Sequence, residues 1–538
     1  MSSIEQFTRR RPYNAVSEFV DANVSRGLGS KVAFSDGKHT LTYKQLQDSS
    51  VRFAHGLEAL GLRQESRIAL LMLDTVDYPV AFWGSLRAGV VCIPLNTLLT
   101  TEQYQYILED SRAEAIFVSA PLTKVITPIL AKLTRLHTIV MCGGTNEDRK
   151  AFGHRDVFMF EDVLERGRDE SFAAPTISDE VAFWLYSSGS TGQPKGARHV
   201  HSSLMATAKL YGQDVLGIVE SDVVYSAAKI FFAYGLGNAM SFPMSVGATT
   251  ILLPDRPAPD TIFALMQRER PTIFYGVPTL YAAMLAHKDI GKGAGSPRLR
   301  RCVSAGEALP ADLGKRWKQV VGVDILDGIG STEMLHIFVS NRPDDVRYGT
   351  SGTPVPGYGA KILGEDGKPV PEGEIGELVV RGPSAADGYW NQRAKSRATF
   401  AGEWTFTGDK YIRDADGYYQ YCGRTDDMFK VSGNWVSPFE VEAALASHES
   451  VLEAAVIGEE DDDKLVKPKA FVVLKPGVAP DDKLIESLKE HVKGRAGMWK
   501  YPRWIEFRSE LPKTATGKIQ RFKLREESAA SKPSGKAA

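Results

Sequence analysis

The sequence predicts an α/β fold: a large N-terminal domain with two doubly wound α/β sheets and a small β-barrel-like subdomain, followed by a small α+β C-terminal domain. The first observation is that short apolar runs alternate with amphipathic segments between residues 42 and 327. The second is a change to turn-rich sequence near residue 350, and the third is a new pattern after Arg424. Sheets of this kind bind ligands beyond the carboxyl ends of their strands, so we expect a site at such an edge.

The first sheet is predicted from residues 42–142. Thr42-x-x-Gln45 is a capping box ahead of a helix whose apolar face carries Leu46, Phe53 and Leu57. The continuous apolar run 67–73 is typical of a strand covered on both faces. The alternation continues with helices at 81–88, from 101 and from 122, and with strands at 90–95, 114–119 and 138–142. A second run predicts the other sheet, with strands near 181–186, 223–227, 249–253, 272–276, 301–304 and 324–327.

The rest of the chain predicts hairpins and then a separate domain. Turn sequences at 365–367 and 371–373 indicate antiparallel β structure over 359–382. Ser437-Pro438-Phe439-Glu440 combines an N-cap, Pro at the first helical position and a capping-box Glu, which predicts a helix to about Ser447. Strands at 451–458 and 469–474 and a helix from Pro480 complete this unit, and the acidic run 459–463 is expected to be a solvated loop. We predict domains at 1–425 and 426–527 and, because its residues are small and polar, a disordered tail at 528–538.

Composition limits the classes of partner. The 538 residues include 65 Lys and Arg against 66 Asp and Glu, so the net charge of −1 gives no electrostatic drive towards nucleic acid or an anionic membrane. The most apolar region, 68–95, contains Asp74, Asp77 and Arg87, which a bilayer-spanning helix would not carry. Four cysteines without C-x-x-C spacing argue against a disulfide framework and a zinc site. We expect a cytoplasmic monomer or homodimer with small-molecule partners.

The segment YSSGSTGQPKG, Tyr186–Gly196, carries the strongest chemical signal. It directly follows a predicted strand, and its hydroxyl and backbone N–H groups can wrap phosphate oxygens while Lys195 adds a positive charge. It is not a G-x-x-x-x-G-K-[ST] loop, because Gln193 and Pro194 separate Lys195 from the second glycine. Taken alone, a segment of this kind is more often an ordinary surface loop.

Five further motifs accompany this loop: SAGEALP (304–310), DGIGSTE (327–333), FTGDKY (406–411), GRTDDMFKVSGNWVSPFEVE (423–442) and PKTATGKIQR (512–521). In this order they resemble the motifs of the adenylate-forming enzymes, which include acyl-CoA synthetases, peptide-synthetase adenylation domains and firefly-type luciferases. The resemblance covers about residues 30–525. It implies ATP, Mg²⁺ and CoA as cofactors or co-substrates, a carboxylate that attacks the α-phosphate to form an acyl-AMP, and a mobile C-terminal domain.

The resemblance also assigns nucleotide contacts. The resemblance implies Glu333 as the Mg²⁺ ligand and places Thr332 at the α-phosphate, and a carboxylate suits a hard cation of this kind. Lys518 is the implied adenylation lysine, a flexible point charge that can neutralise the developing charge. In isolation, Thr332-Glu333 would read equally well as a helix start, and Lys518 as a solvated side chain. The remaining implied contacts are Ser187, Ser188, Gly189, Ser190, Thr191, Gly192 and Lys195 for the phosphates, Gly306, Glu307, Ala308, Asp327, Gly328 and Ile329 for adenine, and Asp409 and Arg424 for ribose.

The identity of the acid is inferred from two segments. AAKIFFAYGLGN (227–238) and STEMLHIF (331–338) are similar to those of benzoate-type aryl-CoA ligases, which implies benzoate or 4-hydroxybenzoate as substrate. Aromatic side chains beside glycines can form a flat slot for a ring, although any single Phe there would more safely be read as core packing. A para hydroxyl could bond His336, which could also merely pack; His199 and His201 are expected to be structural. The residues expected near the ring are Ala228, Phe232, Tyr234, Gly235, Gly330, His336 and Ile337.

Thioester formation is assigned to another face of the C-terminal domain. Gly433 and Trp435 resemble the family's pantetheine channel, although Trp435 could equally be core packing, and Asp426 matches the family's hinge. The segment GMWKYPRW (497–504) departs from the subfamily at Met498 and Trp499, which leaves its conformation open. The competing functions are adenylation of another acid, loading of a carrier protein in trans, luciferase-like oxygen chemistry and nucleotide binding without catalysis.

Overall fold

The computed structural model describes residues 5–152, 157–187, 193–431, 434–461, 465–513 and 519–531. The chain divides into two compact units, the first of residues 1–360 and 380–405, the second of residues 361–379 and 406–538. The boundary predicted at Asp426 therefore does not coincide with this division. It stays a prediction, because a hinge is a point of rotation that a division by contacts does not test.

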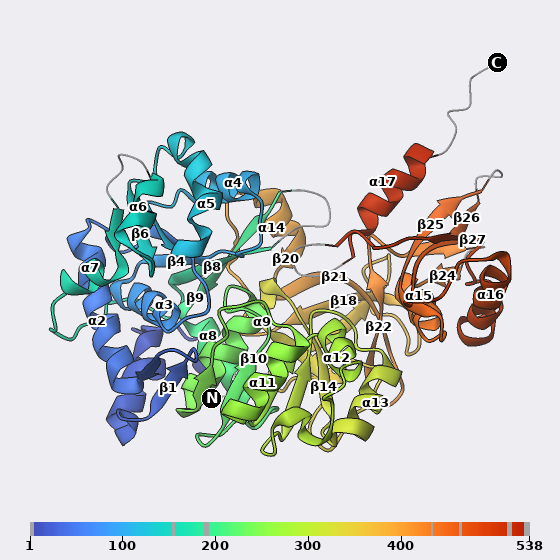
Figure 1. The fold of residues 1–538 in the computed structure, drawn as a ribbon, viewed down its shortest axis with the longest axis horizontal. Helices are drawn as coiled ribbons and strands as arrows, with labels where there is room; N and C mark the ends of the chain where they lie inside the picture. Colours follow the sequence, from blue (N-terminus) through green and yellow to red (C-terminus); the bar gives the residue numbers. More distant parts are fainter. Residues whose placement is uncertain are drawn as a thin grey trace. The chain divides into compact units, whose positions relative to one another are not determined.

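The first unit holds an eight-stranded sheet in the order β19-β9-β8-β4-β3-β5-β6-β7. Strands β3 to β8 run parallel, while β9 and β19 are antiparallel additions at one edge. Figure 1 shows helices α2 and α3 on one side of β4 and β8, and α4 and α5 on the other. The strands are β3 (Arg67–Leu71), β4 (Val91–Pro94), β5 (Ala115–Ser119), β6 (Thr138–Cys142), β7 (Val157–Met159), β8 (Val181–Ser187), β9 (Lys195–Val200) and β19 (Gly388–Tyr389), and the helices are α2 (Tyr43–Ala59), α3 (Asp77–Ala88), α4 (Thr101–Ser111), α5 (Thr123–Ile126), α6 (Asn146–Arg149), α7 (Phe160–Glu165) and α8 (His201–Thr207).

A nine-stranded sheet in the order β16-β15-β14-β13-β12-β10-β11-β1-β2 completes this unit. Two doubly wound sheets are thus confirmed, with one correction: the strand at 181–187 belongs to the first sheet, beside β4, and not to the second. Periodicity along the chain does not say which neighbour a strand selects. The elements are β1 (Val32–Ser35), β2 (Thr40–Thr42), β10 (Val223–Ser226), β11 (Thr249–Ile251), β12 (Ile273–Gly276), β13 (Arg301–Ser304), β14 (Ile325–Gly330), β15 (Ile337–Ser340), β16 (Thr353–Pro354), α1 (Glu5–Thr8), α9 (Ala233–Leu236), α10 (Phe242–Val246), α11 (Pro259–Glu269), α12 (Pro278–Leu285), α13 (Ala311–Val321) and, beyond the sheet, α14 (Arg393–Thr399).

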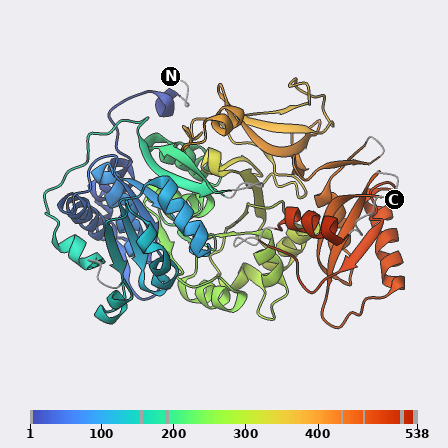
Figure 2. The same cartoon turned by 90° about the horizontal axis from the view of Figure 1, so that it is seen from above.

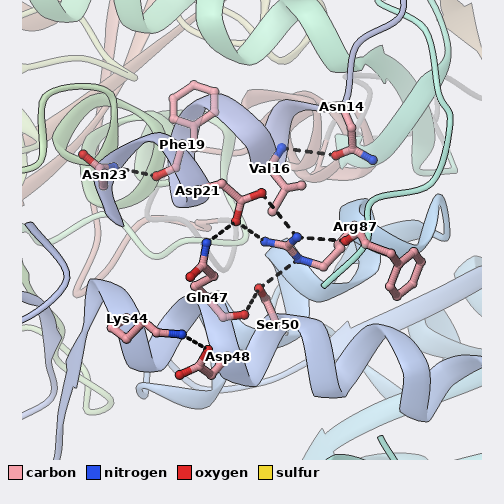
Figure 3. A network of polar contacts seen from close by, with 11 residues as sticks. Asn14, Val16, Phe19, Asp21, Asn23, Lys44, Gln47, Asp48, Ser50 and Arg87 are labelled. Atoms are coloured by element: carbon pink, nitrogen blue, oxygen red, sulfur yellow. Dashed lines mark hydrogen bonds and ion pairs between the residues drawn. The ribbon is translucent and has the colours of Figure 1, made fainter. Parts of the chain in front are cut away.

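The predicted capping box starts α2 as expected. The Thr42 hydroxyl accepts from the Gln45 N–H, and the Gln45 side chain accepts from the Thr42 N–H. On the same helix, Ser50 belongs to a buried network around Arg87, whose side chain is 1% exposed (Figure 3). The Arg87 guanidinium donates to both carboxylate oxygens of Asp21, at 2.6 and 3.3 Å, and to the Phe172 carbonyl at 2.9 Å. This network ties the N-terminal segment to α2 and α3.

The second unit contains the predicted α+β domain, drawn in orange to red in Figure 2. Ser437 caps α15 by accepting from the Glu440 N–H, but the Glu440 carboxylate bonds Lys500 at 2.6 and 2.7 Å. Strand β27 joins the two predicted strands in a three-stranded sheet. The elements are β17 (Gly359–Leu363), β18 (Gly376–Arg381), β21 (Trp404–Arg413) and β22 (Tyr419–Arg424) of a five-stranded sheet, β23 (Phe429–Val431) with β24 (Asn434–Val436), and α15 (Pro438–Ala446), β25 (Val451–Glu460), β26 (Val466–Leu474), α16 (Asp482–Ala496), β27 (Trp504–Phe507) and α17 (Arg521–Ser531). The fifth strand of the five-stranded sheet, β20 (Phe400–Ala401), belongs to the residues assigned to the first unit.

Two expectations near the C-terminus are corrected. Helix α17 continues through Ser531, so the disorder predicted from residue 528 is wrong for 528–531; residues 532–538 lie outside the described part. The reason is a tertiary contact, since the buried Ser528 hydroxyl bonds Glu459 and Lys469. Glu459 and Glu460 end strand β25 and are not in a loop. In the described ranges, no helix is both long and apolar enough to cross a bilayer.

Candidate active site

The predicted phosphate-binding segment connects β8 to β9. Residues 188–192, which include Ser188, Gly189, Ser190, Thr191 and Gly192, lie outside the described residues. Its two flanks are described: Ser187 ends β8, Lys195 begins β9, and the two residues are paired across the antiparallel strands. The ends of the segment are therefore fixed at the sheet edge where a phosphate ligand is expected.

Lys195 and Glu333 form a largely buried ion pair, with side chains 15% and 14% exposed. The Lys195 ammonium lies 2.8 Å from Glu333 Oε1 and 2.6 Å from the Tyr389 hydroxyl, which itself donates to Oε1 at 2.7 Å. Burial alone would raise the pKa of Glu333, but the charge of Lys195 and the hydrogen bonds from Lys195 and Tyr389 overcome it and lower that pKa to about 2. Glu333 is therefore held as an anion.

Thr332 precedes Glu333 in a short helical turn, Thr332–Met334, capped by the Ser331 side chain. The prediction of a helix start and that of a phosphate-site residue are thus compatible. His199 on β9 contacts the Thr332 carbonyl through Nε2 at 2.8 Å. Burial lowers the pKa of His199 to about 4, so the ring is neutral at physiological pH, and its contact joins the two sheets next to Glu333.

The predicted aryl-binding segment follows β10 at the same edge of the nine-stranded sheet. The Tyr234 hydroxyl donates to the carbonyls of Gly276 and Val303, at 3.3 and 3.1 Å, which places it over β12 and β13. Gly235 is required by close packing, because a Cβ there would lie 1.9 Å from the Lys229 carbonyl oxygen. Phe232 is half-buried and bonds that carbonyl through its N–H at 3.0 Å. The structure thus brings Phe232, Tyr234 and Gly235 together.

His336 lies beside this segment, 3% exposed. Its Nε2 is 3.2 Å from the Tyr234 carbonyl and 3.1 Å from Asn238 Oδ1, and its ring centroid is 5.5 Å from that of Tyr234. Both partners are acceptors, so we assign the proton to Nε2, which leaves Nδ1 as an acceptor. Among the described residues Nδ1 has no hydrogen-bond partner. Burial lowers the pKa of His336 to about 3, so the ring is neutral.

The two segments predicted to flank adenine lie at neighbouring strand ends. Gly306, Glu307 and Ala308 follow β13, while Asp327, Gly328 and Ile329 lie within the end of β14, with Ser304 paired to Asp327. Gly306 has φ +93°, a conformation that favours glycine. Gly330 and the buried Ile337 occupy the junction with β15, where a Cβ on Gly330 would lie 2.6 Å from the His336 carbonyl oxygen. Burial raises the pKa of Asp327 to about 8.

The remaining predicted site residues belong to the second unit. Arg424 donates to Asp409 Oδ1 at 3.0 Å and to the Thr407 carbonyl at 3.1 Å, so the two ribose candidates are paired across β21 and β22. Trp435 on β24 is half-buried, with the Lys430 ammonium 4.6 Å from a ring centroid. Asp426 follows β22. Gly433 and Lys518 lie outside the described residues.

Sequence reasoning missed two residues. Tyr389 bonds both Lys195 and Glu333, and Asn238 bonds His336, yet neither was among the predicted site residues. Asn238 could have been predicted, because it is the last residue of the aryl segment 227–238. For Tyr389 the only signal is an aromatic pair, Tyr389-Trp390, after a glycine.

The described flanks of a Gly/Ser/Thr segment, a largely buried lysine–carboxylate pair and a separate group of aromatic residues are the features expected of an enzyme that binds a nucleotide and a small organic substrate. Comparison with known families agrees. Residues 21–390 match the AMP-binding enzyme family and residues 440–518 match the AMP-binding enzyme C-terminal domain. The chain belongs to the AMP-binding enzyme family.

Individual relatives cover nearly the whole chain. The benzoate–CoA ligase of Thauera aromatica is 53% identical over 95% of this chain and 96% of its own length. The 4-hydroxybenzoate–CoA/benzoate–CoA ligase of Rhodopseudomonas palustris is 52% identical over 96% and 94%. Among solved structures, a benzoate CoA ligase from Burkholderia xenovorans has a TM-score of 0.87 at 49% identity, covering 95% of this chain and 100% of that one. An anthranilate CoA ligase in complex with anthranoyl-AMP has a TM-score of 0.90 at 43% identity, covering 97% and 98%.

Proposed function

We propose that this protein is an AMP-forming aryl acid–CoA ligase that converts benzoate or 4-hydroxybenzoate, ATP and CoA into aryl-CoA, AMP and pyrophosphate through an aryl-AMP. The observation that carries the proposal is the meeting of two features at one sheet edge: the Lys195–Glu333 pair and the aromatic segment held by Tyr234 and His336. The near full-length similarity to two ligases with these named substrates supports it.

Glu333 fits a hard cation, because a carboxylate that stays ionised when buried is the ligand type that Mg²⁺ prefers. In the described part of the chain, no group of three or more His, Cys, Asp and Glu side chains is placed to hold a metal ion. Glu333 would therefore share Mg²⁺ with the triphosphate, whose charge the ion neutralises when it is bound. Lys195 adds a point charge beside the phosphates, and Thr332 adds a hydroxyl donor.

The acid site supports both substrates through His336. Its neutral Nδ1 can accept a hydrogen bond from a para hydroxyl, whereas benzoate would leave this acceptor without a partner. A site built to bond a substrate hydroxyl discriminates against an analogue that lacks it. The ratio of kcat/KM for 4-hydroxybenzoate to that for benzoate therefore measures this contribution, and we expect His336→Phe to lower the ratio.

The remaining proposed roles belong to residues of the second unit. We assign the ribose hydroxyls to Asp409, oriented by Arg424, and the hinge to Asp426. Lys518 is the proposed adenylation lysine, which would neutralise charge between the attacking carboxylate and the α-phosphate. Trp435 and Gly433 are proposed to contact pantetheine, and the ammonium of Lys430 beside Trp435 provides positive charge for a polyanionic substrate such as CoA.

The direct test is product analysis with a panel of aryl acids. Purified protein, ATP, Mg²⁺, CoA and each acid should yield the aryl-CoA, identified by mass, with benzoate and 4-hydroxybenzoate giving the highest kcat/KM. Glu333→Gln should abolish the product. Failure across the panel would overturn the proposal, and AMP release that does not respond to CoA would instead indicate loading of a carrier protein.

A further inference from the structure

Tyr389 occupies a position that the proposed function does not explain. Its hydroxyl accepts from the Lys195 ammonium at 2.6 Å and donates to Glu333 Oε1 at 2.7 Å, while Lys195 also reaches Oε1 at 2.8 Å. The Lys195 ammonium additionally lies 4.3 Å from the centroid of the Tyr389 ring. One hydroxyl group therefore contacts both charged groups, as acceptor from Lys195 and as donor to Glu333.

The backbone of Tyr389 is fixed to the strand that carries Lys195. Strand β19 pairs with β9, with Tyr389 opposite Ala197, and the Trp390 N–H donates to the Gly196 carbonyl at 2.9 Å. The Ser396 hydroxyl accepts from the Tyr389 N–H at 3.0 Å. The phenol of Tyr389, 4% exposed as a residue, is thus held in register with Lys195.

Trp390, the residue after Tyr389, is held in place by Asp110 near the end of α4. The Trp390 indole N–H donates to the Asp110 carbonyl at 2.8 Å, and its ring lies 4.8 Å from that of Trp184 on β8. The Asp110 carboxylate accepts from the Tyr186 hydroxyl at 2.6 Å. Tyr186 and Gly196 are the two ends of the predicted phosphate segment. Asp110 bonds Tyr186 directly and reaches Gly196 through Trp390, so one residue of α4 is linked to both ends and to the strand that bears Tyr389.

We propose that Tyr389 is a positioning residue for Mg²⁺·ATP: it orients the Glu333 carboxylate and the Lys195 ammonium, and Trp390 and Asp110 hold it in place. This inference rests on the proposed function, since it assigns ATP to the site of Lys195 and Glu333. Tyr389 acts through these two residues, so its removal should weaken nucleotide binding and aryl-AMP formation and leave the thioester-forming step unchanged.

The test is Tyr389→Phe, which keeps the ring and removes both hydroxyl bonds. Hydrogen bonds to charged groups of this kind correspond to about a 10- to 100-fold change in affinity. We expect a loss of this size in calorimetric binding of α,β-methylene-ATP with Mg²⁺, and in aryl acid-dependent pyrophosphate exchange. CoA thioester formation from supplied aryl-AMP should stay within about twofold of the unmodified protein.

Tyr43→Phe is the matched control, because the Tyr43 hydroxyl is buried and donates to the Ala248 carbonyl at 2.7 Å. It should lower the melting temperature without changing nucleotide affinity. Unchanged nucleotide binding by Tyr389→Phe, or an equal loss in both half-reactions, would overturn the inference. Failure of the proposed function is separate: it would appear as absent aryl acid-dependent exchange in the unmodified protein, while nucleotide binding would still test Tyr389.

Discussion

Replacement of Gly235 by Ala should disrupt the acid site selectively. A Cβ at this position would lie 1.9 Å from the Lys229 carbonyl oxygen, 2.4 Å from its carbon and 2.6 Å from the Ala228 carbonyl oxygen. Real Cβ contacts essentially never fall below 3.0 Å, and these atoms belong to the backbone, so the segment must move by about 1 Å. The same Lys229 carbonyl accepts from the Phe232 N–H, so Ala228 and Phe232 would both be displaced.

The expected size follows from two effects. Overpacking costs about 1–3 kcal/mol of folding free energy. A displacement of about 1 Å at a substrate site reduces the rate about 100-fold. We therefore expect kcat/KM for benzoate to fall about 100-fold. KM for ATP should stay within about twofold because, among the described residues, the side-chain hydrogen bonds and ion pair of Lys195 and Glu333 join them to each other and to Tyr389 and not to this segment.

The assay is steady-state CoA thioester formation with benzoate or ATP varied, together with urea unfolding. Gly494→Ala in α16 is the control, since a Cβ there meets nothing within 4 Å and its φ is not in the left-handed region. This control should gain about 0.5–1 kcal/mol of stability and keep its kinetics. A Gly235→Ala protein with unchanged KM for benzoate would refute the assignment of this segment to the acid site.

Three further predictions concern the Arg87 network, the buried carboxyl of Asp327 and the proposed adenylation lysine Lys518. Arg87→Met should lower the free energy of unfolding by about 3 kcal/mol, the lower end for a broken buried pair because the Asp21 side chain is 27% exposed; an unchanged urea midpoint would contradict this. Burial raises the pKa of Asp327 from 3.8 to about 8, so the contribution of its protonated form to stability is present below pH 3.8 and lost as pH rises through 8. The free energy of unfolding of Asp327→Asn should therefore exceed that of the unmodified protein by an amount that grows from pH 5 to pH 8.5. A difference that stays constant with pH would contradict the raised pKa. Lys518→Ala should abolish acid-dependent pyrophosphate exchange yet retain thioester formation from supplied aryl-AMP, and equal loss of both steps would refute the assigned role.

The fold could be predicted largely because its elements carry local signals. The Thr42 capping box and the alternation of apolar runs depend on residues close in the sequence, and both are confirmed. The sequence could not predict which sheet contains the strand at 181–187. Its neighbour β4 lies about 90 residues earlier in the chain, and the apolar pattern of the strand is compatible with either sheet. The helical structure of residues 528–531 could not be predicted for the same reason, since it is associated with a hydrogen bond from Ser528 to Glu459, which is distant in the sequence.

The sequence indicated candidate site residues where they lie in motifs, and it gave no indication of residues that join the candidate site only through tertiary contacts. Lys195 and Glu333 lie in segments with recognisable spacing, although 138 positions separate them. Tyr389 is 194 positions from Lys195 and 56 from Glu333, and no spacing rule connects the three. Its role follows from the addition of β19 to the edge of a sheet, which is a tertiary event.

The charged groups of the candidate site, Lys195 and Glu333, explain how a protein whose net charge is −1 could bind a polyanion, as we propose. An isolated buried carboxylate would be protonated or would destabilise the fold, so Glu333 can stay ionised only if a cation and donors surround it. Lys195 and Tyr389 meet that requirement, and because lysine is a flexible point charge it can serve a phosphate oxygen as readily as a carboxylate. The proposed recognition of a triphosphate would therefore depend on a few largely buried groups, Lys195, Glu333 and Tyr389, which the overall balance of charge cannot reveal.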